Sequence, residues 1–482
     1  MASLADAVTK VTREGLQAGI RDARLKIDPI FKDFVQDNVS AVRNAQGRSW
    51  EVLHTFVVSN AGAFRVYGDS NGGNIVYGET PDAPAYHTAV SYDDNTPRAF
   101  PGITEFVAPN FVHRTIGLKQ WTGNIFLPHQ ILRSDRLTAA IGKVVEKTIQ
   151  GVSRNLAQHR ANLFFSRDTI NRAIGTVDTV VSGGTTNDTS AIFTLASGRI
   201  RRFQPGMLVD IWNAAGTIRR NGACPLVVHS VDVLAGTVRV DHTQKSSGTF
   251  IKFASQINST TSRDIIVLRN SKAMGPSGLK SWIKDTGSIF GLQLSQVPQF
   301  KSMIIDDLGS VLTDAALNKY FGGFCDSMGA EAEPDVLLTT QGVVNGYVGE
   351  LDDLRVFSVN GTPLNYQGGF SDYGYVYDGR RKSFRVSSLI DSGYLYGLKV
   401  KNNIIRYTPP ALPGAGSNGQ VGGELEFVAP VGGINGIWAH VRNSDGEITD
   451  FVQAPFTFHE EYAPEIPQSL EIGGITEVIA TS

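Results

Sequence analysis

The stretch TGNIFLPHQILRSDRLTAAIGKVV, residues 122–145, decides the fold of this chain. An apolar, strand-like piece leads into Pro128, a short polar break follows, and a helical pattern then begins. Ser134 can cap that helix, and apolar residues recur mostly at helical spacing as far as residue 165. A helix of about 30 residues is about 45 Å long at 1.5 Å per residue. The stretch therefore predicts a strand that leads into one rod-like helix, and it contains no pattern typical of an active site.

The bulk composition describes a folded chain of two or more domains. The 482 residues exceed the usual length of one simple core. With 41% hydrophobic residues, 19% charged residues and a formal net charge of −2, the chain is neither disordered nor built throughout to bind polyanions. Cys224 and Cys325 lie far apart, which predicts two packed thiols and no disulfide framework or metal cluster. Without an apolar signal core or a run of roughly 20 apolar residues, the chain is expected to be made and kept in a cytosol.

Two N-terminal segments have no core of their own. Residues 3–36 carry a helical rhythm of apolar residues that breaks at Pro29, which predicts an amphipathic arm. Residues 51–118 are rich in β-formers and glycine, and FRVYGDSNGGNIVYGE, residues 64–79, predicts a hairpin in a projecting ribbon. A lone hairpin is marginal in water, so both segments need a partner surface. The residues expected to make inter-subunit contacts at the ribbon tip are Asp69, Asn71, Gly72, Gly73 and Tyr77.

The rest of the chain mixes strand and helix patterns, which predicts an α+β fold. Residues 176–255 hold five or more short strands, typical of a small β-barrel or sandwich domain inserted after the long helix. Helical patterns follow in LTDAALNKYFGGFCDSM and TQGVVNGYVGEL, with the strand PDVLLTT between them. A Pro/Gly/Ser linker at residues 409–423 precedes a final β segment, in which GIWAHVRNSDGEITDFVQ predicts a hairpin.

No group of residues predicts catalysis, and we expect no catalytic, metal-binding or cofactor-binding residue. Asp69, Asn71 and Gly73 are spaced like half of a calcium loop, but the twelfth position is Thr80 and no helices flank the segment, which favours a hairpin turn. The nine histidines form no HxH, HExxH or HxxxH motif. The one dense basic run, DGRRKSFR at residues 378–385, is either a surface loop or a site for a neighbour's carboxylates or for nucleic acid.

The order of these parts resembles the major capsid proteins of tailed bacteriophages, which have the HK97-like capsid fold. Two stretches carry the resemblance: residues 123–165, which are similar to the family's loop-return strand and spine helix, and residues 278–340, which lead into its axial domain. The resemblance covers most of residues 1–410. It implies the following parts: N-terminal arm 1–50, extended loop 51–118, peripheral domain 119–175 and 256–300, and axial domain 301–410. Residues 176–255 and 411–482 depart from the family's minimal pattern, and we interpret them as an inserted β domain and as a linker with a C-terminal β segment that returns to the peripheral domain.

The resemblance implies a structural protein of the virion. It would self-assemble into pentamers and hexamers of an icosahedral head that encloses double-stranded DNA, with the DNA contacted non-specifically, and it would be made in the host bacterial cytoplasm. Arm, ribbon and rod make sense physically when identical copies overlap. An encapsulin-type compartment and, in a different class, an enzyme or glycan-binding protein with an appended β domain stay open as alternatives.

Three further expectations concern assembly. The inserted domain should face outwards and contact neighbouring insertions or a decoration protein. About 50 residues precede the ribbon, which is short for a removable scaffold, so we expect a separate scaffolding protein besides a portal. Between Lys32 and Lys119 there is no lysine, so the ribbon has no amine for an isopeptide cross-link to a neighbour.

Overall fold

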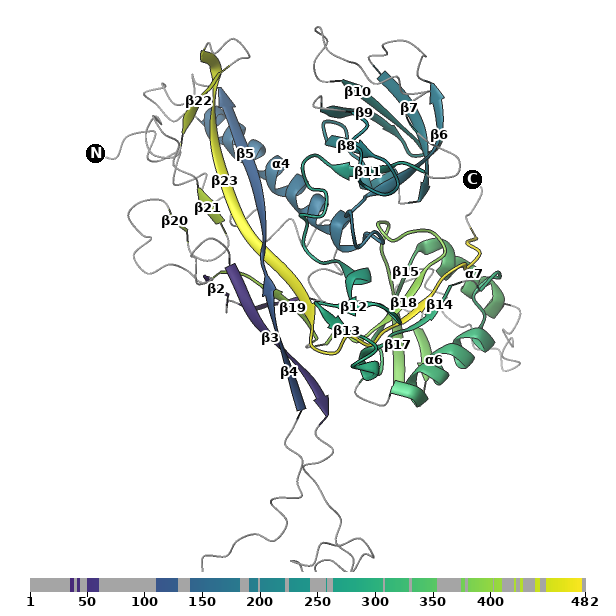
Figure 1. Ribbon diagram of the computed structural model, residues 1–482. Helices are drawn as coiled ribbons and strands as arrows, with labels where there is room; N and C mark the ends of the chain where they lie inside the picture. The colour runs from purple at the N-terminus through teal and green to yellow at the C-terminus, as the bar shows by residue number, and fades with distance from the viewer. Residues whose placement is uncertain are drawn as a thin grey trace, which may run out of the picture. The chain divides into compact units, whose positions relative to one another are not determined.

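The structure is a computed structural model, and the chain divides into two compact units. One unit comprises Met1–Val52 with Ile116–Ser482, and the other comprises Leu53–Thr115. Strands predominate over helices in a mixed α+β chain, which confirms the predicted class (Figure 1). The structure describes residues 35–38, 41–43, 50–59, 110–128, 139–182, 190–197, 200–221, 225–242, 257, 263–306, 308–328, 332–352, 374–377, 380–401, 403–409, 420–421, 425–427, 438–442 and 448–478.

A long pair of antiparallel strands supports the long helix. β5 (Lys119–Pro128) pairs along its whole length with β23 (Ile448–Pro464), in a register that runs from Phe451↔Pro128 to Glu460↔Lys119. The strands lie about 320 residues apart in the sequence but side by side in the fold (Figure 1). The other members of this seven-stranded sheet are β1 (Val35–Asn38), β19 (Ile404–Tyr407), β20 (Gln420–Val421), β21 (Leu425–Phe427) and β22 (Ala439–Arg442).

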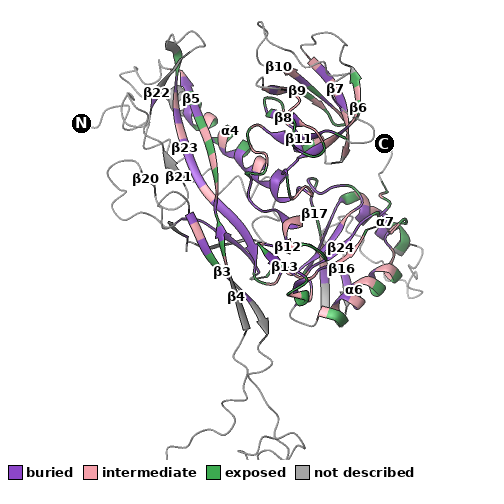
Figure 2. Cartoon of the chain, viewed as in Figure 1, coloured by how far each residue is buried: buried purple, intermediate pink, exposed green. Residues whose placement is uncertain are grey.

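Helix α4 (Ala139–Phe164) covers one face of this strand pair. Its apolar side, with Val145 and Ile149, packs against side chains that alternate along β5 and β23. The opposite side of the helix is exposed as far as residue 155, and the last turns are buried nearly all round (Figure 2). Gly123 of β5 leaves room for the Phe456 ring, because a Cβ there would lie 2.4 Å from a ring carbon. The predicted helix is confirmed over 139–164, and Ser134 lies outside the described residues.

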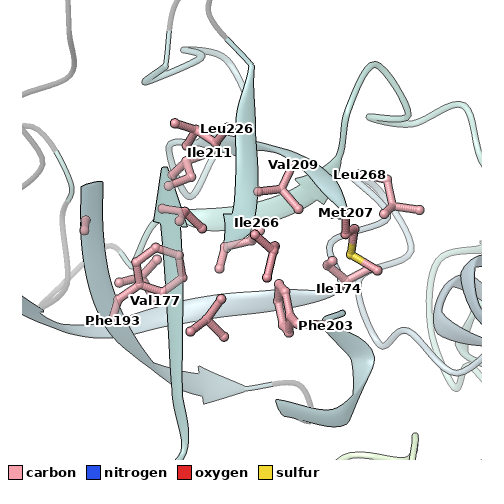
Figure 3. Packing of buried hydrophobic residues seen from close by; sticks show 14 of the residues in the cluster. Ile174, Val177, Phe193, Phe203, Met207, Val209, Ile211, Leu226, Ile266 and Leu268 are labelled. Atoms are coloured by element: carbon pink, nitrogen blue, oxygen red, sulfur yellow. The ribbon is translucent and has the colours of Figure 1, made fainter. Parts of the chain in front are cut away.

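Six strands after α4 close into a barrel in the order β10-β7-β6-β11-β8-β9. Val and Ile side chains point inward and are fully buried, and Leu163 of α4 belongs to the same core (Figure 3). The sixth strand, β11, lies beyond residue 255 and pairs in antiparallel orientation with both β6 and β8. The barrel elements are β6 (Gly175–Ser182), β7 (Ser190–Ser197), the 3-10 turn η4 (Ile200–Arg202), β8 (Leu208–Trp212), β9 (Leu226–Asp232), β10 (Thr237–His242) and β11 (Ile265–Leu268).

A six-stranded mixed sheet carries two further helices of the described chain. α6 (Asp314–Met328) and α7 (Gln341–Asp352) pack on it through Phe321, Phe324 and Val343, and both predicted helices are confirmed. The Thr313 hydroxyl accepts a hydrogen bond from the Ala316 amide at 3.1 Å at the start of α6. In sheet order the strands are β14 (Met303–Ile305), β24 (Leu470–Ile472), β18 (Leu395–Leu398), β15 (Val336–Thr339), β17 (Arg380–Val386) and β16 (Gly374–Tyr377).

Short elements complete the described chain. β3 and β4 lie in one three-stranded sheet with β2, and β12 pairs with β13. In the unit Leu53–Thr115, His54 and Phe56 are buried and meet edge to face, with ring centroids 4.4 Å apart. The remaining bounds are β2 (Val42–Arg43), β3 (Trp50–Ser59), β4 (Asn110–Gly117), η5 (Leu279–Ser281), β12 (Ser288–Ile289), β13 (Leu292–Gln293) and η6 (Pro298–Phe300).

One sequence interpretation is corrected. Beyond the break predicted at Pro29, Val35–Asn38 is a strand that pairs in parallel with β19, and the predicted helical rhythm before it lies outside the described residues. The basic run is no surface loop at Lys382, which lies buried on β17 with its amine 2.5 Å from Glu333. A strand turns alternate side chains to opposite faces, so a basic run can place one lysine inside. Within the described residues, no helix is long and apolar enough to span a membrane.

Candidate functional site: buried ion pairs and a hollow beside the long helix

The residues predicted from the sequence at the ribbon tip lie outside the described residues: Asp69, Asn71, Gly72, Gly73 and Tyr77. Within the described ranges, no group of three His, Cys, Asp or Glu side chains is placed to hold a metal ion. What the structure brings together instead is a set of buried charged side chains where α4, the barrel and the two sheets meet.

Glu460 of β23 lies between two arginines and is fully buried. Its two carboxylate oxygens accept from Arg160 of α4, at 2.9 Å from Nε and 2.5 Å from the terminal nitrogen. Arg406 of β19 donates from Nε to the same carboxylate at 2.8 Å. The Arg160 guanidinium also lies over the Phe458 ring, 4.7 Å from its centroid. Because guanidinium groups stay charged, this triad fixes α4 to two strands of the sheet.

Arg202 of η4 makes the corresponding junction for the barrel, and it is 1% exposed. It donates to the Leu389 carbonyl at 2.6 and 2.9 Å and to the Phe165 carbonyl at 3.0 Å. Its terminal nitrogen lies 2.9 Å from Asp391, in the segment between β17 and β18. One side chain thereby joins the barrel, the end of α4 and the six-stranded sheet.

Glu471 of β24 anchors two further segments. Arg167, just after α4, lies 2.7 Å from this carboxylate, and Lys280 of η5 lies 2.5 Å from its other oxygen. The Arg167 guanidinium stacks 3.6 Å from the centroid of Tyr394 and donates to the Tyr396 hydroxyl at 3.0 Å. Burial raises the pKa of Tyr396, so this hydroxyl stays protonated at neutral pH.

Glu461 faces a different environment from its neighbour Glu460, because adjacent residues of a strand point to opposite faces. It accepts from the backbone amides of Ser277 and Tyr462, at 2.5 and 3.1 Å. Burial raises the pKa of Glu461 and lowers the pKa of Arg172. The charge of the Arg172 guanidinium interacts with this carboxylate, and the guanidinium donates a hydrogen bond to the Ser281 hydroxyl at 2.8 Å. Arg172 adopts φ +61°, a left-handed conformation uncommon for arginine, on the linker between α4 and the barrel.

These charged groups join elements that lie far apart in the sequence. Glu460 and Glu471 lie against arginine or lysine nitrogens, an arrangement typical of structural ion pairs. The signal in the sequence was FTFHEEYAP, residues 456–464, where two glutamates interrupt an aromatic strand. That pattern indicates buried charge, but it does not name the arginines that pair with it.

A hollow of about 570 Å³ opens between α4, β5 and the barrel. His159 lines it, and burial lowers the pKa of this imidazole to about 4, so the side chain is neutral at pH 7. Leu208 is 42% exposed and Met274 is 65% exposed at the same hollow. The rest of the lining is mixed, with the apolar side chains of Trp121, Leu156, Met207 and Phe456 beside the polar ones of Gln120, Asn155, Gln204 and Arg269.

Comparisons with known proteins give structural neighbours only. No protein-family model and no curated protein matches the sequence. A chain of the cyanophage A-1(L) capsid asymmetric unit is 11% identical, with 93% of each chain covered and a TM-score of 0.40. A chain from Mycobacterium phage Adephagia is 9% identical, with 91% of this chain and 84% of that chain covered and a TM-score of 0.32. The SrpI encapsulin of Synechococcus elongatus is 11% identical, with 37% and 56% covered and a TM-score of 0.21.

Proposed function

We propose that this protein is the major capsid protein of a tailed bacteriophage, a structural subunit and not an enzyme. Copies of it assemble into pentamers and hexamers of an icosahedral head around double-stranded DNA. The observation that carries the proposal is the union of β5, α4 and β23: a rod-like helix is fixed on a strand pair whose members lie about 320 residues apart in the sequence. Such a rigid union is suited to the wall of a shell.

The parts of the chain take the following roles in this proposal. Residues 119–175 and 256–300 form the peripheral domain, residues 301–410 the axial domain with the six-stranded sheet, and residues 411–482 the linker and returning strand. The barrel, residues 176–255 with β11 added, is the inserted domain and faces outwards. The long pairing of β23 with β5 supports the return of the C-terminal segment to the peripheral domain.

The arm, residues 1–50, and the extended loop, residues 51–118, contact neighbouring copies in this proposal. Its support is that residues 53–115 form a unit separate from the rest of the chain. A strand pair without its own core is marginal in water and gains stability when a neighbour covers it. A scaffolding protein, a portal and a decoration protein are the expected partners, and the virion is the expected location.

Electron microscopy of the purified protein tests the proposal directly. Closed shells with five-fold and six-fold clusters of subunits are expected. A chain that stays monomeric by light scattering over a range of salt, pH and protein concentration would contradict it. Closed shells that hold protein cargo and no DNA when isolated from the producing cells would favour the encapsulin-type alternative.

A further inference from the structure

Amides predominate among the polar side chains of the hollow beside α4. Asn124 of β5 and Asn155 of α4 are exposed there, and among the described lining residues there is no Asp, Glu or Lys. The amide-bearing residues of the lining are Gln120, Asn124, Asn155, Gln204 and Asn270. A side-chain amide both donates and accepts hydrogen bonds, and so does a hydroxyl group. The lining therefore favours a ligand that is rich in hydroxyl groups.

Arg269 brings the one permanent charge into the described lining. Within the part of the chain that the structure describes, no carboxylate forms an ion pair with it, and one of its terminal nitrogens is buried without a hydrogen-bond partner. Arg160 and Arg202 differ in this respect, since they lie 2.5 and 2.9 Å from a carboxylate oxygen. A guanidinium stays charged and matches the planar shape of a carboxylate. The hollow therefore holds a positive charge with which a carboxylate on a ligand can pair.

Two more side chains of the lining hold a buried nitrogen that has no hydrogen-bond partner within the described chain. They are Trp121 of β5, through Nε1, and His159 of α4, through Nδ1. An indole N–H can only donate, and a neutral imidazole nitrogen donates or accepts according to its tautomer. Buried polar atoms are seldom left unpaired in proteins. Together with Arg269, these side chains favour a ligand whose oxygen atoms accept hydrogen bonds.

The apolar part of the lining gives such a ligand a hydrophobic surface. Leu208 and Met274 are partly exposed in the hollow, and Met207 and Phe456 are buried in its lining. A sugar ring has hydroxyl groups around its edge and C–H groups on its faces, so it suits a lining that offers both amides and apolar side chains. The volume of about 570 Å³ is within the range of small-ligand sites and exceeds what a simple inorganic anion fills.

We propose that the hollow between α4, β5 and the barrel binds a sugar acid, that is, a small saccharide that carries a carboxylate. The carboxylate pairs with Arg269 and accepts from the Trp121 indole, while the hydroxyl groups bind the amides of Asn124 and Asn155. The nitrogens without partners are shielded from solvent in this structure, so binding requires these side chains to turn towards the ligand. The site lies within one chain, and it goes beyond the proposed function because it does not depend on assembly.

Titration calorimetry of the full chain with glucuronate tests the ligand class. One saturable site per chain is expected. Glucose lacks the carboxylate and acetate lacks the hydroxyl groups, so each should bind at least about tenfold more weakly. The indole N–H resonance of Trp121 should shift with the same midpoint as the heat signal. The proposal is overturned if glucuronate does not bind, if glucose or acetate binds as tightly, or if the Trp121 resonance stays in place at saturation.

Two substitutions separate the two halves of the ligand. Arg269→Gln should lower the affinity for glucuronate to that for glucose, because only the carboxylate loses its partner. Asn155→Ala should weaken the binding of both sugars, because both present hydroxyl groups to this amide. Denaturant unfolding of Arg269→Gln should match that of the parent, since no carboxylate of the described chain pairs with this guanidinium.

The matched control is Arg263→Gln in the barrel, where the arginine pairs with Asp178 outside the lining of the hollow. This variant should bind glucuronate as the parent does. Equal affinity of Arg269→Gln and the parent for glucuronate would overturn the assignment of the carboxylate. A chain that forms closed shells but binds no sugar acid would overturn the ligand site and leave the proposed function intact, so the two failures are distinguishable.

Discussion

The barrel and the α4–β5–β23 union differ in how their charged side chains are buried. The barrel has an apolar core with fully buried positions such as Leu226. Its buried carboxylates Asp210 and Asp264 pair with arginines that reach solvent, at 23% and 26% exposure. The union also has an apolar core, but all three members of its triad, Arg160, Glu460 and Arg406, are buried. Because loss of one member of a fully buried group leaves an uncompensated charge, we expect the union to depend more strongly on each charged partner than the barrel does.

The largest effect is expected at the triad. Glu460→Ala leaves two buried guanidinium groups without their carboxylate, and removal of one partner of a buried pair costs about 3–5 kcal/mol. Denaturant unfolding of the soluble subunit measures the free energy of unfolding. Replacement of all three residues by apolar ones, Arg160→Met with Glu460→Leu and Arg406→Met, should recover most of the loss.

The matched control for this prediction is Glu146→Ala on the exposed side of α4. There Glu146 accepts a hydrogen bond from Gln150 within the helix, so the loss should stay below about 0.5 kcal/mol. Equal effects of the two substitutions would remove the distinction between the union and an ordinary surface.

The barrel should respond to a cavity in its own core. Leu226→Ala removes a fully buried side chain of β9 and should cost about 3 kcal/mol. In Leu226→Ala, hydrogen exchange is expected to show faster opening of β6 to β11 than of β5 and β23, because the barrel strands form a sheet separate from the one that contains β5 and β23. Val181→Ala at an exposed barrel position is the control. Uniform loss of protection over both regions would show that they unfold as one cooperative unit.

A smaller effect of pH should come from His159 at the boundary of the two regions. Burial lowers its pKa from 6.5 to about 4, so the unfolded chain binds the proton more readily between these values. The stabilising contribution is present above pH 6.5 and is lost as the pH falls towards 4. The melting temperature of His159→Gln should therefore decline less than that of the parent over this window.

The pH measurement needs a control for the other groups that titrate in the same range. Glu461, with its raised pKa, acts in the opposite sense because the folded chain holds its proton more readily. The difference between variant and parent isolates His159 from this background, and His229→Gln on the exposed face of the barrel serves as the matched substitution. A parallel pH profile for His159→Gln and the parent would contradict the assignment.

Local pattern was enough to predict the elements that decide the fold, and it failed where distant residues meet. Helices α4 and α6 follow from their apolar spacing, and the strands of the barrel follow from short β runs between turn residues. The addition of β11 to the barrel could not be predicted, since pairing between distant strands leaves no local mark. Likewise, nothing in the local sequence LAQHR marks Arg160 as buried, because its partner Glu460 lies 300 residues away on β23.

The last comparison concerns covalent bonds between copies, and here we expect no effect: boiling and reduction should release single chains. An isopeptide cross-link from the ribbon to a neighbour needs a lysine amine on the ribbon, and the sequence from residue 33 to residue 118 contains no lysine. Lys119 begins β5, where it pairs in register with Glu460, and so belongs to the union and not to the ribbon.

Contact between copies in the proposed shell then rests on burial, hydrogen bonds and ion pairs. Apolar area is worth about 25 cal/mol per Å², so a few hundred Å² per ribbon contributes several kcal/mol before ordering costs. Particles that are boiled and reduced should give one electrophoretic band near 52.1 kDa. A ladder of multimers that survives boiling and reduction would show that covalent bonds join the copies.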